Sequence, residues 1–218
     1  MRKKYKVIIF DWDGTIVNST GLIVKAIKEA ALVKGITLID ERKISSVIGL
    51  GLDQAFRVLF NNTSMQEIIE LQELYKDFYL ENINKVSLFD GIVPGIKDLH
   101  RRGYNLAIAT GKSRRGLDID LKQSGLESLF NITKTMDECF SKPHPQMVNE
   151  ILDFYIIEKN EALIVGDSTY DLEMALNAGI DSLGVTFGSH NKAELLNYNP
   201  KAIVDNAYEI FEWIMRNE

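Results

Sequence analysis

The sequence is poor in cysteine, histidine and proline. Cys139 is the only cysteine among 218 residues, so no disulfide framework and no thiolate metal site are expected. The histidines His100, His144 and His190 lack the spacing of metal ligands. Prolines number only four, and no Ser/Pro-rich linker, low-complexity run or internal repeat is present. These features exclude a disulfide-stapled or zinc-stabilised domain.

An excess of basic residues and a long apolar run are also missing. The net charge is -6, and no block of Lys and Arg suggests nucleic-acid binding. No segment approaches the roughly 20 apolar residues of a membrane helix, so no membrane association is expected. The start, MRKKYKVIIF, resembles a signal peptide, but Asp11 ends the apolar run early. We therefore predict a cytoplasmic protein. The sequence has no coiled-coil heptad, and we expect a monomer, with a homodimer as the alternative.

What is present is a series of short apolar runs. Continuous β-branched residues followed by turn residues are typical of strands that are covered on both faces of a parallel sheet. Such runs occupy residues 6–10, 105–110, 162–166 and 182–187, and residues 131–135 form a weaker candidate. The sequence thus supplies strands for an open parallel sheet.

Helical patterns alternate with these strands. Ser113 is a candidate N-cap of a helix that runs to Gly125, and Ser168 or Thr169 is one for a helix that ends near Gly179. Alternating strands and helices indicate an α/β fold with a doubly wound, mostly parallel sheet.

The interval after the first strand differs, because it has long helical patterns, at residues 21–35 and 65–83, and no convincing strand. We predict a helical unit at residues 17–86, inserted into an α/β core that consists of residues 1–16 and 87–218.

Polar residues follow the predicted strands. In open α/β sheets, ligands bind beyond the carboxyl ends of the strands. An Asp13-Gly14 turn would explain Gly14, but it leaves Asp11 at the tip of an apolar strand unexplained. A group of carboxylates without sulfur ligands suits Mg²⁺, and a lysine beside backbone donors suits a phosphate. The candidates are Asp11, Asp13, Thr110, Gly111, Lys142, Asp167 and Asp171.

Four motifs then occur in a fixed order: DWDGT at residues 11–15, IATGKS at 108–113, FSKPHP at 140–145 and VGDSTYD at 165–171. This ordered set resembles the haloacid dehalogenase superfamily, and the resemblance covers nearly the whole chain. A lone DxDG would be a weak signal, whereas the ordered set is specific.

The resemblance implies a role for each matching residue. Asp11 would be the nucleophile that forms an aspartyl-phosphate, and Asp13 would be the general acid and base. Asp11, the main-chain carbonyl of Asp13 and Asp167 would hold Mg²⁺. Asp171 would support the metal's waters or hold Lys142. Phosphoryl binding would fall to Thr110, Gly111 and Lys142.

The same resemblance implies a function. An acid two residues after the nucleophile favours a phosphatase over a dehalogenase, because an alcohol leaving group needs a proton and a halide does not. The helical insertion resembles a small cap of the phosphoglycolate phosphatase group, so a small phosphate ester is the expected substrate. A β-phosphoglucomutase-like enzyme is the alternative, although such enzymes commonly have Val where Thr15 stands. Pyrophosphate or a nucleotide as substrate, or a non-catalytic phosphate-binding protein, also stays open.

Several residues have two interpretations. Gly49 and Gly51 either line a loop that reaches the substrate or form a turn between helices. Arg57 either meets a substrate carboxylate or forms a surface ion pair, and the ion pair is favoured. Lys112 either binds phosphate or is an exposed lysine at a helix start. Trp12 and Cys139 are expected to be packing residues.

Overall fold

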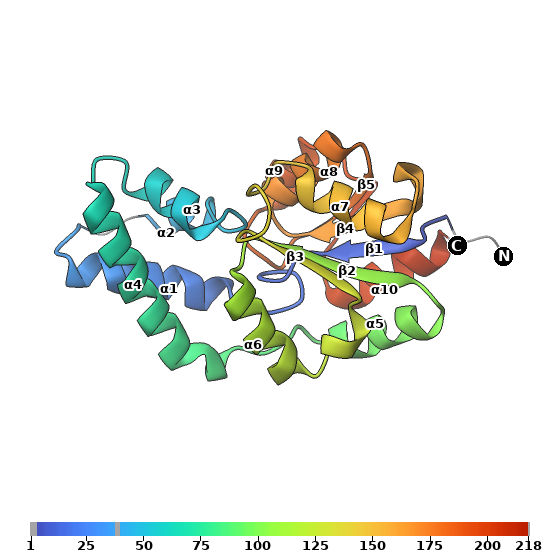
Figure 1. Ribbon diagram of the computed structural model, residues 1–218, viewed down its shortest axis with the longest axis horizontal. Helices are drawn as coiled ribbons and strands as arrows, with labels where there is room; N and C mark the ends of the chain where they lie inside the picture. Colours follow the sequence, from blue (N-terminus) through green and yellow to red (C-terminus); the bar gives the residue numbers. More distant parts are fainter. Residues whose placement is uncertain (1–3, 38–39, 218) are drawn as a thin grey trace.

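The computed structural model describes residues 4–37 and 40–217. Within these residues a parallel sheet of six strands forms the centre of the molecule, in the order β3-β2-β1-β4-β5-β6 (Figure 1). The strands are β1 (Val7–Phe10), β2 (Asn105–Thr110), β3 (Ile132–Thr135), β4 (Ala162–Gly166), β5 (Asp181–Val185) and β6 (Ala202–Val204). Strand β1 is therefore central, with β2 and β4 as its neighbours.

The apolar run of β1 is buried on both faces of the sheet. Ile8 and Phe10 pack into one hydrophobic cluster, whereas Val7 and Ile9 pack into another. Ile9 is in register with Ala107 of β2 and Ile164 of β4. This two-sided burial is the physical reason why the strand is continuously apolar rather than alternating.

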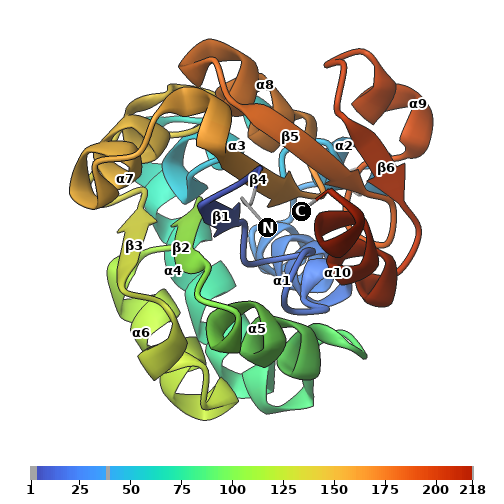
Figure 2. The same cartoon turned by 90° about the vertical axis from the view of Figure 1, so that its right-hand side faces the viewer.

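Helices cover both faces of the sheet (Figure 2). On one face lie α5 (Ile92–Arg101), α6 (Arg114–Ser124) and α10 (Ala207–Arg216). On the other lie α7 (Gln146–Tyr155) and α8 (Thr169–Ala178). Helix α9 (Lys192–Leu196) lies between β5 and β6 in the sequence, and single 3₁₀ turns occupy Ile83–Lys85, Glu127–Leu129 and Lys159–Glu161.

Four of the helices between β1 and β2, namely α1 to α4, form what we call the cap. Its helices are α1 (Thr20–Val33), α2 (Glu41–Ser45), α3 (Leu52–Leu59) and α4 (Met65–Asn82). These helices share a hydrophobic cluster of their own, which includes Ile27, Phe56 and Leu71. The chain leaves the core near Val17 and returns near Leu88, and these two residues form an isolated bridge. The division into a core and an inserted unit at residues 17–86 stays a prediction.

The predicted α/β fold with a parallel sheet is confirmed, including the weak candidate at residues 131–135, which is β3. The strand predicted at residues 182–187 begins at Asp181 and ends at Val185. Strand β6 was not predicted, because three residues at the sheet edge are too short for a recognisable pattern. In the described part of the chain, no helix combines the length and apolarity needed to cross a bilayer.

Candidate active site

The candidate site lies at the carboxyl ends of the three central strands. Asp11 follows β1, Thr110 ends β2, and Asp167 follows β4. Strands β2 and β4 lie on opposite sides of β1. In an open sheet, ligands bind at the point where the loops after such neighbouring strands diverge. The sheet therefore brings together residues that are 99 and 156 positions apart in the sequence, 110 − 11 and 167 − 11.

A cluster of buried carboxylates occupies this point. Asp11, Asp167 and Asp171 each offer an oxygen within 4.8 Å of the other two, and among the described residues they form the group suited to hold a metal ion. All three side chains are buried. Charged groups in such surroundings require compensation by cations and hydrogen bonds.

Lys142 supplies part of this compensation. Its ammonium group donates to Oδ1 of Asp11 at 2.5 Å and to Oδ1 of Asp171 at 2.6 Å, and its side chain is 0% exposed. Burial alone would lower the pKa of this lysine, but the charges of Asp11 and Asp171 raise it above its ordinary value. Lys142 is therefore charged at neutral pH.

One ammonium group does not balance three carboxylates. Burial raises the pKa of Asp11 well above its ordinary value, and the charges of Asp171 and Asp167 add to this despite Lys142. Burial and the charge of Asp171 likewise raise the pKa of Asp167. An oxygen-only donor set with excess negative charge is suited to a hard divalent cation, so these residues fit Mg²⁺.

Asp167 is held in one orientation by its neighbours. Its Oδ1 accepts a hydrogen bond from the Thr15 hydroxyl at 3.1 Å. Its Oδ2 accepts from the main-chain N–H and the hydroxyl of Ser189, each at 2.7 Å. A Cβ atom at Gly188 would lie 2.2 Å from Oδ2. Our sequence analysis missed Ser189 and Gly188, although their position after β5 is itself a strand-end signal.

Asp13 lies apart from this carboxylate cluster. Its carboxylate accepts a hydrogen bond from the Ser19 hydroxyl at 2.7 Å and contacts the Lys112 ammonium at 3.2 Å. The proposed metal ligand of Asp13 is its main-chain carbonyl, and that role stays a prediction. A role of the side chain in proton transfer likewise stays a prediction.

Lys112 is not an exposed helix-start lysine, so that interpretation is wrong. Its ammonium group contacts Asp13, lies 3.2 Å from Asp120 and donates to the Tyr79 hydroxyl of the cap at 3.1 Å. Burial lowers its pKa, but the surrounding charges, chiefly that of Asp13, raise it above the ordinary value. Lys112 therefore links the cap to Asp13.

Two of the predicted phosphate-binding residues, Thr110 and Gly111, line the same cavity as Asp11 and Asp13. Thr110 is buried, and its hydroxyl accepts a hydrogen bond from the main-chain N–H of Lys112. Gly111 lies against the cap, since a Cβ there would be 2.7 Å from the carbonyl oxygens of Gly49 and Leu50. This contact explains why a residue without a side chain stands at position 111.

The two cap glycines have different surroundings. Gly49 has a φ of +104° and lines the cavity described below. Gly51 is the N-cap residue of α3, and its N–H donates to the Ser141 hydroxyl of the core at 2.9 Å. The second glycine thus opens the next helix, and substrate contact by either glycine stays a prediction.

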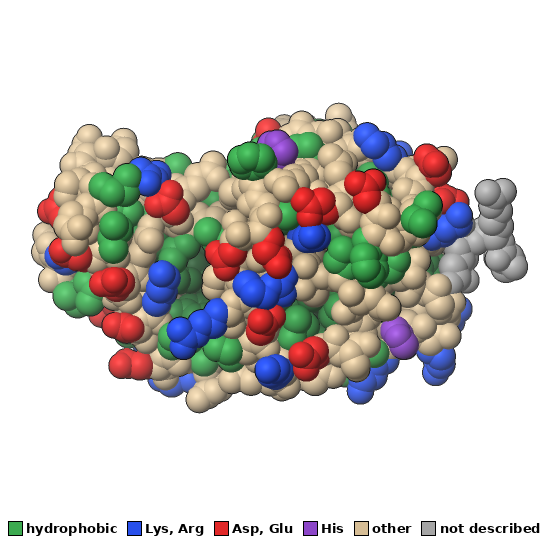
Figure 3. Space-filling model, viewed as in Figure 1, with side chains coloured by type: hydrophobic (Ala, Val, Ile, Leu, Met, Phe, Trp, Pro, Cys, Tyr) green, Lys and Arg blue, Asp and Glu red, His purple; other side chains and the backbone are tan. Residues whose placement is uncertain are grey.

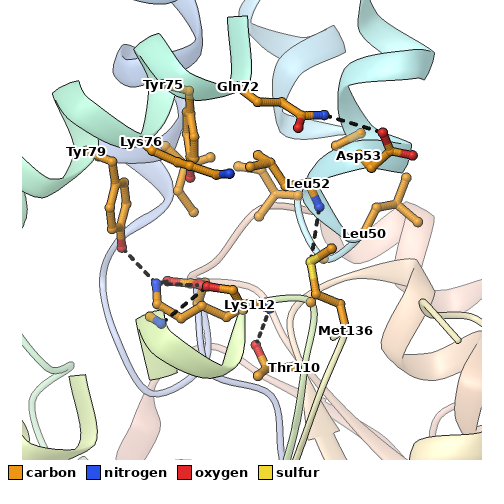
Figure 4. A pocket seen from close by; sticks show the side chains of 18 of the residues that line it. Leu50, Leu52, Asp53, Gln72, Tyr75, Lys76, Tyr79, Thr110, Lys112 and Met136 are labelled. Carbon is orange, nitrogen blue, oxygen red and sulfur yellow. Dashed lines mark hydrogen bonds and ion pairs between the residues drawn. The ribbon is translucent and has the colours of Figure 1, made fainter. Parts of the chain in front are cut away.

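A cavity of about 400 Å³ extends from Asp11, Asp13 and Thr110 into the cap (Figure 4). Figure 3 shows hydrophobic side chains in a hollow between cap and core, with basic side chains at its edge. The favoured interpretation of Arg57 agrees with the structure, because this exposed side chain pairs with Asp53 at 2.7 Å.

Trp12 and Cys139, the expected packing residues, and His190 are at least partly buried. Trp12 is fully buried and donates through Nε1 to Asp120 at 2.8 Å. Cys139 is half-buried and packs against the cluster that includes Met147. His190 is buried, and its Nδ1 accepts a hydrogen bond from the N–H of Thr169.

Comparison with known proteins gives consistent results. A family model described as haloacid dehalogenase-like hydrolase matches residues 8–185. The chain is 32% identical to the probable phosphatase IndB of Dickeya dadantii, over 94% of this chain and 91% of that protein. It is 27% identical to a phosphoglycolate phosphatase of Vibrio parahaemolyticus, over 95% of each. A crystal structure of a putative haloacid dehalogenase-like hydrolase from Bacteroides fragilis superposes with a TM-score of 0.87 at 27% identity, covering 95% of this chain and 100% of that one.

Proposed function

The chain belongs to the haloacid dehalogenase-like hydrolase family, and from this premise we propose that it is a Mg²⁺-dependent phosphatase that acts through an aspartyl-phosphate on Asp11. The observation that carries the proposal is the buried cluster of Asp11, Asp167 and Asp171 in contact with Lys142. Such a cluster is costly to fold and is explained by a site that receives a cation and a phosphoryl group.

The metal would be held by Asp11, Asp167 and the main-chain carbonyl of Asp13. Asp171 accepts from the Lys142 ammonium through Oδ1 and from Ser168 through Oδ2. We therefore assign it to holding Lys142. When bound, Mg²⁺ supplies positive charge that stabilises the phosphoryl oxygens.

In the first step an oxygen of Asp11 attacks the phosphorus atom and the bond from phosphorus to the leaving alcohol breaks. Asp13, protonated at this stage, donates its proton to the leaving oxygen. An ammonium group has three N–H donors, and we assign the one not bound by Asp11 or Asp171 to a phosphoryl oxygen. Thr110 and Gly111 would supply further donors.

In the second step water attacks the phosphorus atom of the aspartyl-phosphate. The Asp13 carboxylate accepts a proton from that water, and the bond between phosphorus and the Asp11 oxygen breaks. Inorganic phosphate leaves, Asp11 returns to a carboxylate, and Asp13 is again protonated. The two steps together consume only the ester and water, and they release the alcohol and inorganic phosphate.

The test is phosphate release from p-nitrophenyl phosphate with Mg²⁺ and with EDTA. We expect turnover with Mg²⁺ and its loss with EDTA, because uncompensated carboxylates repel the phosphate. A sugar-phosphate mutase would keep phosphate in organic form and convert one sugar phosphate into another. The proposal fails if Mg²⁺ has no effect on release.

The first mutation to test is Asp11→Asn. An amide cannot form the acyl-phosphate, so turnover should fall by at least about a thousandfold while the circular dichroism spectrum is unchanged. Asp153→Asn is the matched control, because Asp153 is exposed on α7 away from the cavity. It should stay within twofold of wild type. A substantial rate in Asp11→Asn contradicts the nucleophile assignment.

A further inference from the structure

The cavity above the proposed phosphate position is far larger than a phosphate and a two-carbon alcohol need. Its volume is about 400 Å³, within the range of roughly 300–1,000 Å³ in which drug-sized ligands bind. Binding energy from parts of a substrate remote from phosphorus can be used to lower the reaction barrier. An alcohol that filled only a small part of this volume would provide little of this binding energy.

The cap side of the cavity is mainly apolar. It is lined by side chains from α1, α3 and α4 and the loop before α3, among them Ile23, Ile27, Val47, Leu52, Phe56 and Ile83. Tyr75 and Tyr79 stack on each other beside them, with ring centroids 5.7 Å apart. Flat aromatic faces and branched aliphatic groups favour an apolar, ring-bearing ligand.

Two cations without a partner among the described residues line this cavity, Lys76 of α4 and Arg115 of α6, and both residues are solvent-exposed. Lys76 of α4 extends across the cavity (Figure 4). In the residues that the structure describes, its ammonium group has no ion-pair or hydrogen-bond partner. The other polar cap groups are engaged, since Asp53 pairs with Arg57 and accepts from Gln72. Lys112 is likewise engaged by Asp13 and Asp120.

From this arrangement we propose that the substrate is a phosphomonoester of an apolar, ring-bearing alcohol with an anionic group remote from phosphorus. The ring packs against Tyr75 and Tyr79, and the anion pairs with Lys76. This inference rests on the proposed function and specifies its leaving group. Lys76 is then a specificity-determining residue, distinct from the residues that carry out the chemistry.

The test compares benzyl phosphates that bear a 4-carboxyl group on a spacer of zero, one or two methylenes. Each acid is paired with its methyl ester, which has the same ring and a similar leaving alcohol but no charge. 2-Phosphoglycolate and inorganic pyrophosphate complete the panel. We expect one acid to exceed its ester and both small substrates in kcat/KM by about tenfold, the effect of one charge-assisted hydrogen bond in a half-open site.

A pair of variants identifies the contact. Lys76→Met should lower kcat/KM for the preferred acid about tenfold and for its methyl ester less than twofold. Lys43→Met is the matched control, since Lys43 is exposed on α2 and does not line the cavity. It makes the same change in net charge, and it should leave both substrates within twofold.

Three results would overturn the inference. One is a preference for 2-phosphoglycolate or pyrophosphate, and another is an equal loss of acid and ester in Lys76→Met. In both cases phosphate release from p-nitrophenyl phosphate still supports the phosphatase itself. The third is the absence of release from every ester, which would overturn the proposed function and this inference together.

Discussion

At the scale of single residues, the predicted general acid Asp13 is the residue that favours a phosphatase over a dehalogenase. Its carboxylate is bound by Ser19 and Lys112, at the cap side of the acid cluster. The leaving alcohol would depart toward the same side, because the cavity extends from Asp13 into the cap. A proton donor is needed there.

Replacing this acid should affect substrates unequally. We expect Asp13→Ala to slow the first-turnover release of benzyl alcohol from benzyl phosphate by about a hundredfold or more, and that of p-nitrophenol from p-nitrophenyl phosphate by less than tenfold. The nitrophenolate leaves without protonation, whereas an alkoxide does not. Rapid-quench measurement of the released alcohol isolates this step from the later attack of water, which needs Asp13 as a base for both esters. Similar losses for the two esters would argue against a role as general acid.

Gly188 lies against Asp167, which we propose as a metal ligand. Gly188→Ala would place a Cβ 2.2 Å from Oδ2 of Asp167 and displace that carboxylate. We expect the Mg²⁺ concentration for half-maximal activity to rise by about tenfold to a hundredfold, the usual effect of disturbing a group that orients a ligand.

The control for this substitution is Gly21→Ala. Gly21 lies in α1, where no atom outside its immediate neighbours approaches within 4 Å of an added Cβ. Alanine is the better helix former, so this variant should be as stable as wild type or more so, with unchanged Mg²⁺ dependence. A normal Mg²⁺ requirement in Gly188→Ala would show that Asp167 does not bind the metal.

At the scale of single elements, helix α8 combines a structural and a functional interaction. Ser168 is its N-cap residue and accepts from the N–H of Asp171, while Oδ2 of Asp171 accepts from the N–H and hydroxyl of Ser168. The other oxygen of Asp171 binds Lys142. The same capping box that starts the helix therefore orients the carboxylate that holds the lysine.

Removing this cap should change both stability and activity. Ser168→Ala should lower the free energy of unfolding by about 1 kcal/mol, the usual cost of a lost N-cap, and kcat should fall because Asp171 loses a restraint. Asn191→Ala is the control, since Asn191 caps α9 in an equivalent capping box on the exposed surface. Urea unfolding should show similar losses in the two variants, and kcat should fall only in Ser168→Ala.

At the scale of the whole molecule, side-chain and main-chain contacts join the cap to the core beside the cavity. The Tyr170 hydroxyl donates to the carbonyl of Ser46 at 2.9 Å, and Ser141 accepts from the N–H of Gly51. The Tyr79 hydroxyl accepts from Lys112. These polar contacts are replaceable by water, and Met136 and Tyr170 of the core also pack against the cap. This is the kind of interface that permits a cap to open for substrate entry.

Metal binding should stabilise the molecule as a whole. A ligand that binds only the folded state at a hundred times its Kd adds about 2.7 kcal/mol, which corresponds to a rise in Tm of roughly 5–10 °C for a protein of this size. We expect this rise with Mg²⁺ in differential scanning fluorimetry and its reduction in Asp167→Asn. Asp153→Asn should behave as wild type. An equal rise in Asp167→Asn would place the metal elsewhere.

Local patterns in the sequence determined most of the fold and the candidate residues. The strands from β1 to β5 and the caps at Ser113 and Ser168 could be recognised because apolar periodicity and capping depend on residues within a few positions of one another. The order of the motifs likewise depends only on the chain. The short edge strand β6 carried too little pattern to be recognised.

Only the tertiary structure decided which distant side chains meet. The burial of Lys112 between Asp13 and Tyr79, the Ser189 hydrogen bonds to Asp167 and the free Lys76 in an apolar cavity arise from the packing of cap on core. No local pattern encodes them, because each depends on segments separated along the chain and on the space that remains between them. For this protein the sequence determined the candidate reacting groups, and the packing of the cap against the core decided the shape and charge of the cavity beside them.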